Sequence, residues 1–195
     1  MSILSFTKLI FPLLFWLFLI IGFDPLGTAV ITVLSAVIHE FGHIGAIYLI
    51  HGKIVLPLAR MRGFSLSKNR LSSYKEEMLI ALSGPLINLL IFILCLPFYS
   101  MADGYISLIA VINVMTFVSN MLPLRGYDGY LVLYNLIATK RDAQSAELTM
   151  RPISFAFSTV LVFFSLFLIL KIGEGYWIFA VFFAVLLEEI FKRGN

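Results

Sequence analysis

The sequence is poor in charged residues and in cysteine. Charged residues make up 13% of its 195 residues, against about 25% in a typical soluble domain. The single cysteine, Cys95, lies inside an apolar run and cannot form an intramolecular disulfide, which excludes a disulfide-stabilised secreted scaffold. Internal repeats, low-complexity tracts and Gly/Ser linkers are also absent from the sequence. We therefore expect one domain, spanning residues 1–195.

Apolar residues, in contrast, are abundant. They make up 61% of the chain, with 19 Phe and a mean hydropathy of +1.00, which excludes a disordered chain and an ordinary cytosolic enzyme. Charged residues divide the sequence into apolar stretches, and a membrane-spanning helix needs roughly 20 such residues. The sequence predicts six spans, the first and last being short; the stretches are residues 9–23, 25–50, 78–102, 104–124, 152–170 and 175–187.

The distribution of positive charge predicts the orientation of these spans. An even number of spans places both termini on one side of the membrane, and the loops on that side hold most of the Lys and Arg. The positive-inside rule then places both termini in the cytoplasm. Lys8 and the apolar run after it are typical of a signal peptide, but no small-x-small cleavage site follows near Gly22. We expect a retained helix.

One long hydrophilic stretch, residues 51–77, follows the second span. Residues 54–58 and 63–67 have short β-like patterns, and Gly63 is a plausible turn between them. A β-hairpin and a solvated cytoplasmic loop are both compatible with this pattern.

The second span contains ionisable residues, which are costly in a membrane and are therefore functional candidates. The motif His-Glu-Phe-Gly-His at residues 39–43 holds two of the chain's three histidines. His39 and His43 would share one face of a helix, and zinc binds neutral imidazole nitrogen. Glu40 could then act as general base toward a metal-bound water. The alternative is a polar cluster that stabilises a helix bundle, and His51 is interpreted as an interfacial residue.

A catalytic zinc usually has three protein ligands, so a third must come from elsewhere. Asp128 follows Pro123 and Gly126, which interrupt an apolar stretch that resumes at Tyr130. Non-helical backbone at membrane depth is tolerated only where protein buries it or water lines it. The sequence therefore predicts a broken helix that carries Asp128 to the metal, with an ordinary cytoplasmic turn as the alternative.

The third span holds Ser-Gly-Pro at residues 83–85, followed by Asn88. Small residues let neighbouring helices approach closely, and Gly42 and Gly45 on the second span could do the same. Asn88 would be a buried hydrogen-bonding group. Taken alone, these residues indicate helix packing.

In combination, the three motifs resemble the site-2 protease family of intramembrane zinc metalloproteases. That family carries His-Glu-x-x-His on one span, Ser-Gly-Pro with a following Asn on the next, and Asn-x-x-Pro with a later Asp-Gly on a third. The matching stretches here are residues 39–43, 83–88 and 120–129. The resemblance implies an all-α polytopic membrane protein with a three-helix catalytic core at about residues 25–140. The flanking helices are expected at about residues 5–23, 152–171 and 175–191.

The same resemblance implies roles for particular residues. Glu40 would activate water, and Zn²⁺ would be bound by His39, His43 and Asp128. Two asparagines, Asn120 and Asn88, would be candidates for contacts with the substrate or the reaction oxyanion. The stretch after the second span resembles the family's membrane-associated β-hairpin, and the metal would lie nearer the cytoplasmic face.

One stretch departs from the family pattern. The family commonly has a second Pro shortly before Asp-Gly, whereas residues 125–127 here are Arg-Gly-Tyr, so we expect a more flexible loop. The chain leaves no room for a PDZ or CBS domain, which predicts a small form of the family regulated by partners or by substrate processing.

The leading hypothesis is a multi-pass zinc endopeptidase of a prokaryotic cell membrane. It would hydrolyse a peptide bond in or near a transmembrane segment of another membrane protein, as in regulated intramembrane proteolysis. The alternative is a noncatalytic membrane binding protein on the same fold, against which the intact Glu40 argues. An ion transporter would spread its carboxylates along a path, whereas here they cluster. The expected partners are the substrate, the lipid bilayer and a regulatory membrane protein, with no nucleic acid.

Overall fold

The computed structural model describes residues 27–52, 72–98, 104–173 and 176–191. Within these ranges all regular secondary structure is helical. The expected first helix at residues 5–23 and the expected β-hairpin after the second helix lie outside the described residues. The described elements are α2 (Thr28–His51), α3 (Tyr74–Cys95), the 3₁₀ turn η3 (Leu96–Phe98), α4 (Tyr105–Asn120), α5 (Asp128–Lys140), α6 (Ala143–Ile172) and α7 (Tyr176–Phe191).

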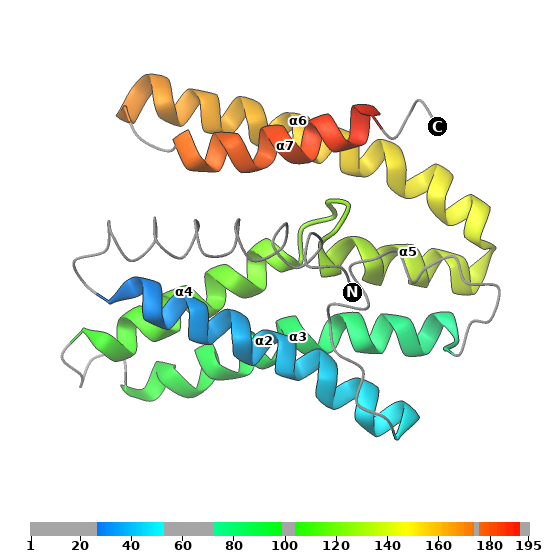
Figure 1. The fold of residues 1–195 in the computed structure, drawn as a ribbon, viewed down its shortest axis with the longest axis horizontal. Helices are drawn as coiled ribbons and strands as arrows, with labels where there is room; N and C mark the ends of the chain where they lie inside the picture. Colours follow the sequence, from blue (N-terminus) through cyan, green and yellow to red (C-terminus); the bar gives the residue numbers. More distant parts are fainter. Residues whose placement is uncertain (1–26, 53–71, 99–103, 174–175, 192–195) are drawn as a thin grey trace, which may run out of the picture.

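Helix α3 is the centre of the helix packing. It packs against α2, α4 and α5, while α6 packs against α5 and α7. Figure 1 shows α6 and α7 side by side as a pair above the group formed by α2 to α5. The second, third and broken fourth spans of the sequence analysis therefore form one group, and the α6–α7 pair joins it along α5.

The helices carry apolar surfaces on the outside and small or polar residues inside. Three of the described helical segments are long and apolar enough to cross a membrane: Thr28–His51, Tyr74–Phe98 and Ala143–Ile172. Large side chains such as Leu49 and Leu170 are exposed, whereas Ala81, Ala110 and Ser158 are fully buried. Membrane helices pack in this way because lipid, unlike water, does not drive large apolar side chains inward. The prediction of an all-α membrane fold is supported, but the described residues do not establish six spans.

The fourth predicted span is broken, as expected from its sequence. Helix α4 ends at Asn120 and α5 begins at Asp128; between them the Tyr127 N–H donates to the Leu124 carbonyl at 3.0 Å, and Leu124 is fully buried. The 16 residues of α4 extend about 24 Å, less than the roughly 30 Å hydrocarbon core. The break places Asp128 in the first turn of a new helix.

Helix α6 is longer than predicted. The expectation of a helix from about residue 152 was wrong, since α6 begins at Ala143 and continues through Pro152. Asp142 caps its N-terminus by accepting a hydrogen bond from the Ser145 N–H at 2.6 Å, which satisfies a donor that the helix leaves unpaired. The uncharged stretch begins later than the helix because the first turns of α6 carry Glu147.

Candidate metal centre

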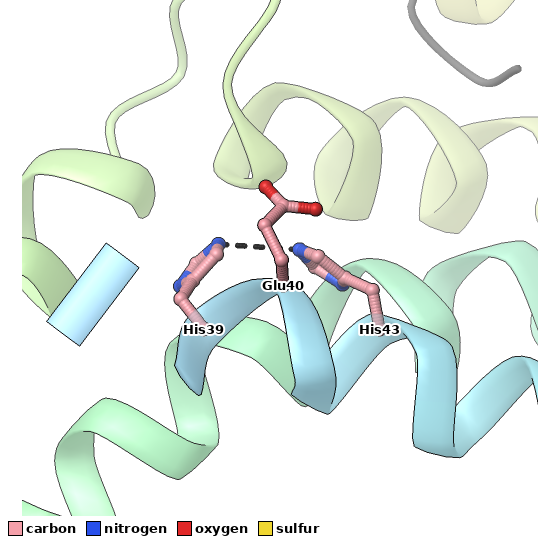
Figure 2. Close-up of side chains that lie close together, drawn as sticks. All are labelled: His39, Glu40 and His43. Carbon is pink, nitrogen blue, oxygen red and sulfur yellow. Dashed lines mark hydrogen bonds between the residues drawn. The ribbon is translucent and has the colours of Figure 1, made fainter. Parts of the chain in front are cut away.

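Helix α2 brings the side chains of His39, Glu40 and His43 close together. His39 and His43 lie one turn apart, each only 5% exposed, with their Nε2 atoms 3.2 Å apart. Figure 2 shows the Glu40 side chain extending from the helix in front of the line that joins the two rings. The ligand atoms of the three residues lie within 4.8 Å of one another, and Glu40, unlike the histidines, is exposed. A molecule bound beside the imidazoles would therefore be within reach of the Glu40 carboxylate.

Asp128 reaches the same point from the start of α5. Its Oδ2 lies 2.9 Å from His39 Nε2 and 3.2 Å from His43 Nε2, and the residue is 9% exposed. The three atoms form a triangle with sides of 2.9 to 3.2 Å. Ligand atoms 2.0–2.1 Å from a tetrahedral zinc are about 3.3 Å apart. The spacing and the donor set of two imidazoles and one carboxylate therefore fit zinc.

The far side of each ring fixes where its hydrogen lies. His43 Nδ1 is 2.7 Å from the Ile80 carbonyl oxygen, which can only accept, so Nδ1 is the donor. His39 Nδ1 lies 2.7 Å from Asn88 Oδ1. The orientation of this amide is set by its other end, because Asn88 Nδ2 donates to the Ser35 carbonyl at 3.3 Å. His39 therefore also carries its hydrogen on Nδ1.

With both rings neutral, as metal ligands must be, this hydrogen-bonding leaves three lone-pair atoms facing one another at the centre of the site. A neutral imidazole with Nδ1–H presents an unprotonated Nε2, and an ionised Asp128 offers only acceptor oxygens. Such a group of acceptors repels unless a cation lies among them. Acceptors on the outer ring nitrogens are also the usual arrangement around zinc-bound histidines.

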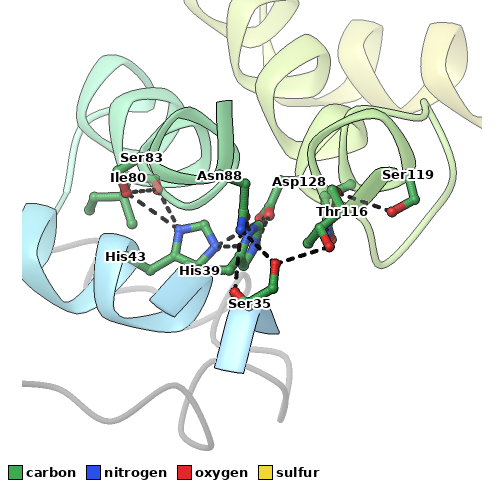
Figure 3. A network of polar contacts seen from close by, with 10 residues as sticks. Ser35, His39, His43, Ile80, Ser83, Asn88, Thr116, Ser119 and Asp128 are labelled. Carbon is green, nitrogen blue, oxygen red and sulfur yellow. Dashed lines mark hydrogen bonds and ion pairs between the residues drawn. The ribbon is translucent and has the colours of Figure 1, made fainter. Parts of the chain in front are cut away.

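A polar network behind His39 was not found from the sequence. Asn88 Nδ2 donates to Ser35 Oγ at 3.0 Å and to Asn113 Oδ1 at 2.9 Å, and Ser35 Oγ donates to Asn113 Oδ1 at 3.1 Å. Figure 3 shows this network passing from His39 through Asn88 and Ser35 to Thr116. The available signal was a set of polar side chains within apolar helices, with Ser35 one turn before His39.

Two glycines let α2 and α3 approach closely enough to build the site. A Cβ at Gly84 would lie 2.5 Å from His43 Nε2 and 2.8 Å from His39 Nε2. A Cβ at Gly42 would lie 2.7 Å from the Ser83 carbonyl oxygen. A Cβ at Gly45 would meet nothing within 4 Å, so the predicted packing role holds for Gly42 and is wrong for Gly45.

The two asparagines predicted to contact substrate lie in different surroundings. Asn120 is half-buried, and its Nδ2 donates to the Thr116 carbonyl of its own helix at 2.9 Å. Asn88 is fully buried, and its amide is engaged by His39, Ser35 and Asn113. These hydrogen bonds let Asn88 orient the His39 ring, and a contact of either asparagine with substrate stays a prediction.

The third histidine lies away from this centre. His51 is the last residue of α2, and its Nε2 is 3.0 Å from Ser72 Oγ, just before α3. The structure places it apart from the ligands, in agreement with its interpretation as a residue at the end of the span.

Comparison with known proteins supports the fold. No protein-family model matches the chain, and no curated protein does so either. Among solved structures, the site-2 protease from Methanocaldococcus jannaschii is similar, with a TM-score of 0.63 and 20% sequence identity over 90% of this chain and 85% of that chain. The chain shares the fold of a site-2 protease. The resemblance expected from the three sequence motifs is thus confirmed for the fold.

Proposed function

We propose that the chain is an intramembrane zinc endopeptidase of the site-2 protease family. The observation that carries the proposal is the convergence of His39 Nε2, His43 Nε2 and Asp128 Oδ2, with Glu40 beside them. The shared fold supports it. The substrate would be a transmembrane segment of another membrane protein, cleaved in a prokaryotic cell membrane with both termini of the enzyme in the cytoplasm.

Each side chain has a separate task in the proposed reaction. His39, His43 and Asp128 would hold the zinc, which when bound polarises the scissile carbonyl and makes hydroxide available near neutral pH. Glu40 takes the proton of the attacking water on a carboxylate oxygen and delivers it to the leaving amine. Asn88 and the Ile80 carbonyl hold the two rings so that each Nε2 faces the centre.

The position of Glu40 separates this proposal from a noncatalytic membrane protein on the same fold. A site that only binds metal needs the three ligands, and Glu40 is not within hydrogen-bond distance of them. Its carboxylate nevertheless lies within 4.8 Å of both ligand nitrogens. That distance suits a carboxylate that acts on a water bound beside the imidazoles.

Replacing Glu40 by Gln tests the proposal. Glu40→Gln should keep zinc bound, because the ligands are intact, while cleavage of a membrane-inserted substrate should fall at least about 10²-fold because the general base is lost. Zinc content is measured on the purified protein, and cleavage in proteoliposomes. Glu77→Gln, in the first turn of α3, is the matched control and should retain both. Full activity of Glu40→Gln would reject the mechanism.

A further inference from the structure

Asp128 lies between two residues that are attached to α6. Arg125 precedes it in the break between α4 and α5, and Tyr130 follows it in the first turn of α5. The Arg125 guanidinium forms an ion pair with Glu147 of α6, and the Tyr130 hydroxyl donates to the other oxygen of the same carboxylate at 3.2 Å. One carboxylate on α6 thus holds the chain on both sides of Asp128.

Arg125 and Tyr130 also contact each other. The guanidinium carbon lies 5.8 Å from the centroid of the Tyr130 ring, within the range of a cation–π contact. The positive charge therefore has a carboxylate and an aromatic face as partners, and its position is fixed by both.

The backbone of Arg125 is attached to the α6–α7 pair as well. Its N–H donates to Ser154 Oγ at 2.9 Å, and the Ser154 hydroxyl in turn donates to Glu189 of α7 at 2.6 Å. Ser154 is fully buried and Glu189 is 2% exposed. The structure places the Glu189 carboxylate inside the helix packing, where a carboxylate needs hydrogen bonds and a nearby positive charge.

We propose that Arg125, Glu147, Ser154 and Glu189 form a clamp by which the α6–α7 pair positions Asp128. The inference rests on the proposed metal site, and it assigns these four residues a positioning role that their sequence motifs do not indicate. In the described residues α6 and α7 contribute no ligand atom to the centre, yet they set how firmly its third ligand is held. In this proposal the contacts of Arg125 restrain residues 125–127, in place of the constraint that a second Pro would give.

The sharpest test compares two buried serines of α6. Ser154→Ala removes the hydroxyl that joins Arg125 to Glu189. Ser158→Ala removes an equally buried hydroxyl that donates only to the Phe155 carbonyl of its own helix, at 2.9 Å. Each variant is purified as the full chain, and its affinity for Zn²⁺ is measured by competition with a chelating dye. Ser154→Ala should bind zinc about 10- to 100-fold more weakly than the parent protein, and Ser158→Ala should match the parent.

The visible spectrum of the Co²⁺-substituted protein gives a readout that a general loss of stability would not move. Loosening Asp128 should change the intensity and position of the cobalt bands in Ser154→Ala and leave them unchanged in Ser158→Ala. Equal zinc affinities and identical cobalt spectra for the two serine variants would overturn the clamp.

A second pair of variants keeps the test valid if Ser154→Ala does not fold. Arg125→Met and Glu147→Gln each break the ion pair without removing a group from the fully buried region. Each should weaken zinc binding, and the double variant should be no weaker than the worse single variant, because both act through one interaction. Unchanged zinc affinity in both single variants would overturn the clamp.

The clamp and the proposed protease can fail separately. If the variants show the expected differences in zinc affinity but the parent protein cleaves no membrane substrate, the clamp is supported and the protease proposal is rejected. A protein that cleaves membrane substrates while Ser154→Ala and Arg125→Met bind zinc as the parent does would reject the clamp alone.

Discussion

At the scale of single residues, Gly84 lies where an added side chain would clash most directly with the proposed metal ligands. Its Cα lies against the two ligand nitrogens, and a methyl group there would come within 2.5 Å of His43 Nε2. Gly84→Ala should therefore displace one imidazole. Zinc affinity should fall by at least about 100-fold, because changing a residue that only hydrogen-bonds to a ligand already costs about 10- to 100-fold. Zinc content after dialysis against a weak chelator measures this.

The control for Gly84→Ala is the same substitution on α2. Gly45→Ala adds a methyl group into open space and replaces a poor helix former by the best one. It should retain zinc. If both variants keep stoichiometric zinc, the ligand nitrogens do not occupy the positions described, and this arrangement of the metal ligands is rejected.

The proposed set of three zinc ligands depends on Asp128. Asp128→Ala should lose both zinc and activity, since two imidazoles alone hold the ion weakly. The control is Asp142→Asn. Asp142→Ala would be a poor control because it removes the cap of α6, which typically costs about 1 kcal/mol, whereas Asn caps a helix as well as Asp. Stoichiometric zinc in purified Asp128→Ala would assign the third ligand to another residue.

The sequence predicted some of these residues and could not predict others. The spacing of His39 and His43 on a helix fixes their shared face, and the helix-breaking residues before Asp128 marked its segment as unusual. The role of Gly84 could not be predicted, because it depends on how closely α3 crosses α2. The role of Asn88 depends likewise on which way its amide points, and that is set by Ser35 on another helix.

At the scale of helices, the buried network couples the orientation of His39 to three elements. Asn88 of α3 joins His39 and Ser35 of α2 to Asn113 of α4. Asn88→Ala should weaken zinc binding about 10- to 100-fold and destabilise the protein by about 1–3 kcal/mol, because the partners stay buried without it. Zinc competition and thermal unfolding measure the two effects.

A buried asparagine on α5 provides the control for this change. Asn135 is also buried, but its Nδ2 donates to the Leu131 carbonyl of its own helix at 2.8 Å. Asn135→Ala should leave zinc affinity unchanged. Equal losses of zinc affinity in the two variants would mean that Asn88 acts through stability alone.

Helix boundaries were predictable where apolar composition alone determines them. The interruption between α4 and α5 was visible in Pro123 and Gly126. The start of α6 could not be predicted from uncharged stretches, because its first turns carry Glu147, which pairs with Arg125. The burial of Glu189 could not be predicted either, because its carboxylate accepts a hydrogen bond from Ser154 on another helix, and one sequence does not name that partner.

At the scale of the whole molecule, the centre lies among helices whose outer faces are apolar. The ligands come from α2 and α5, which both pack on α3, and long apolar side chains such as Phe163 and Leu170 cover the outside of α6. A substrate of the proposed protease that reaches this site from the membrane would itself be a helix. Its carbonyls are hydrogen-bonded to N–H groups one turn away, so the scissile region must unwind before it can be attacked.

Unwinding predicts which substrates are cleaved fastest. Gly in a helix interior is about 1 kcal/mol less favourable than Ala, so replacing Leu by Gly near the scissile bond should raise the cleavage rate about fivefold, and restoring Leu should suppress it. The measurement is the initial rate for paired Gly and Leu substrates in proteoliposomes that contain the full chain. Glu40→Gln serves as the blank that corrects for any contaminating protease.

The difference in cleavage rate between the Gly and Leu substrates should vanish when the substrate is presented as a soluble unfolded peptide, because no helix remains to open. Cleavage of that soluble peptide at the membrane-inserted rate, with no difference between Gly and Leu, would exclude recognition of a transmembrane helix even with the zinc chemistry intact.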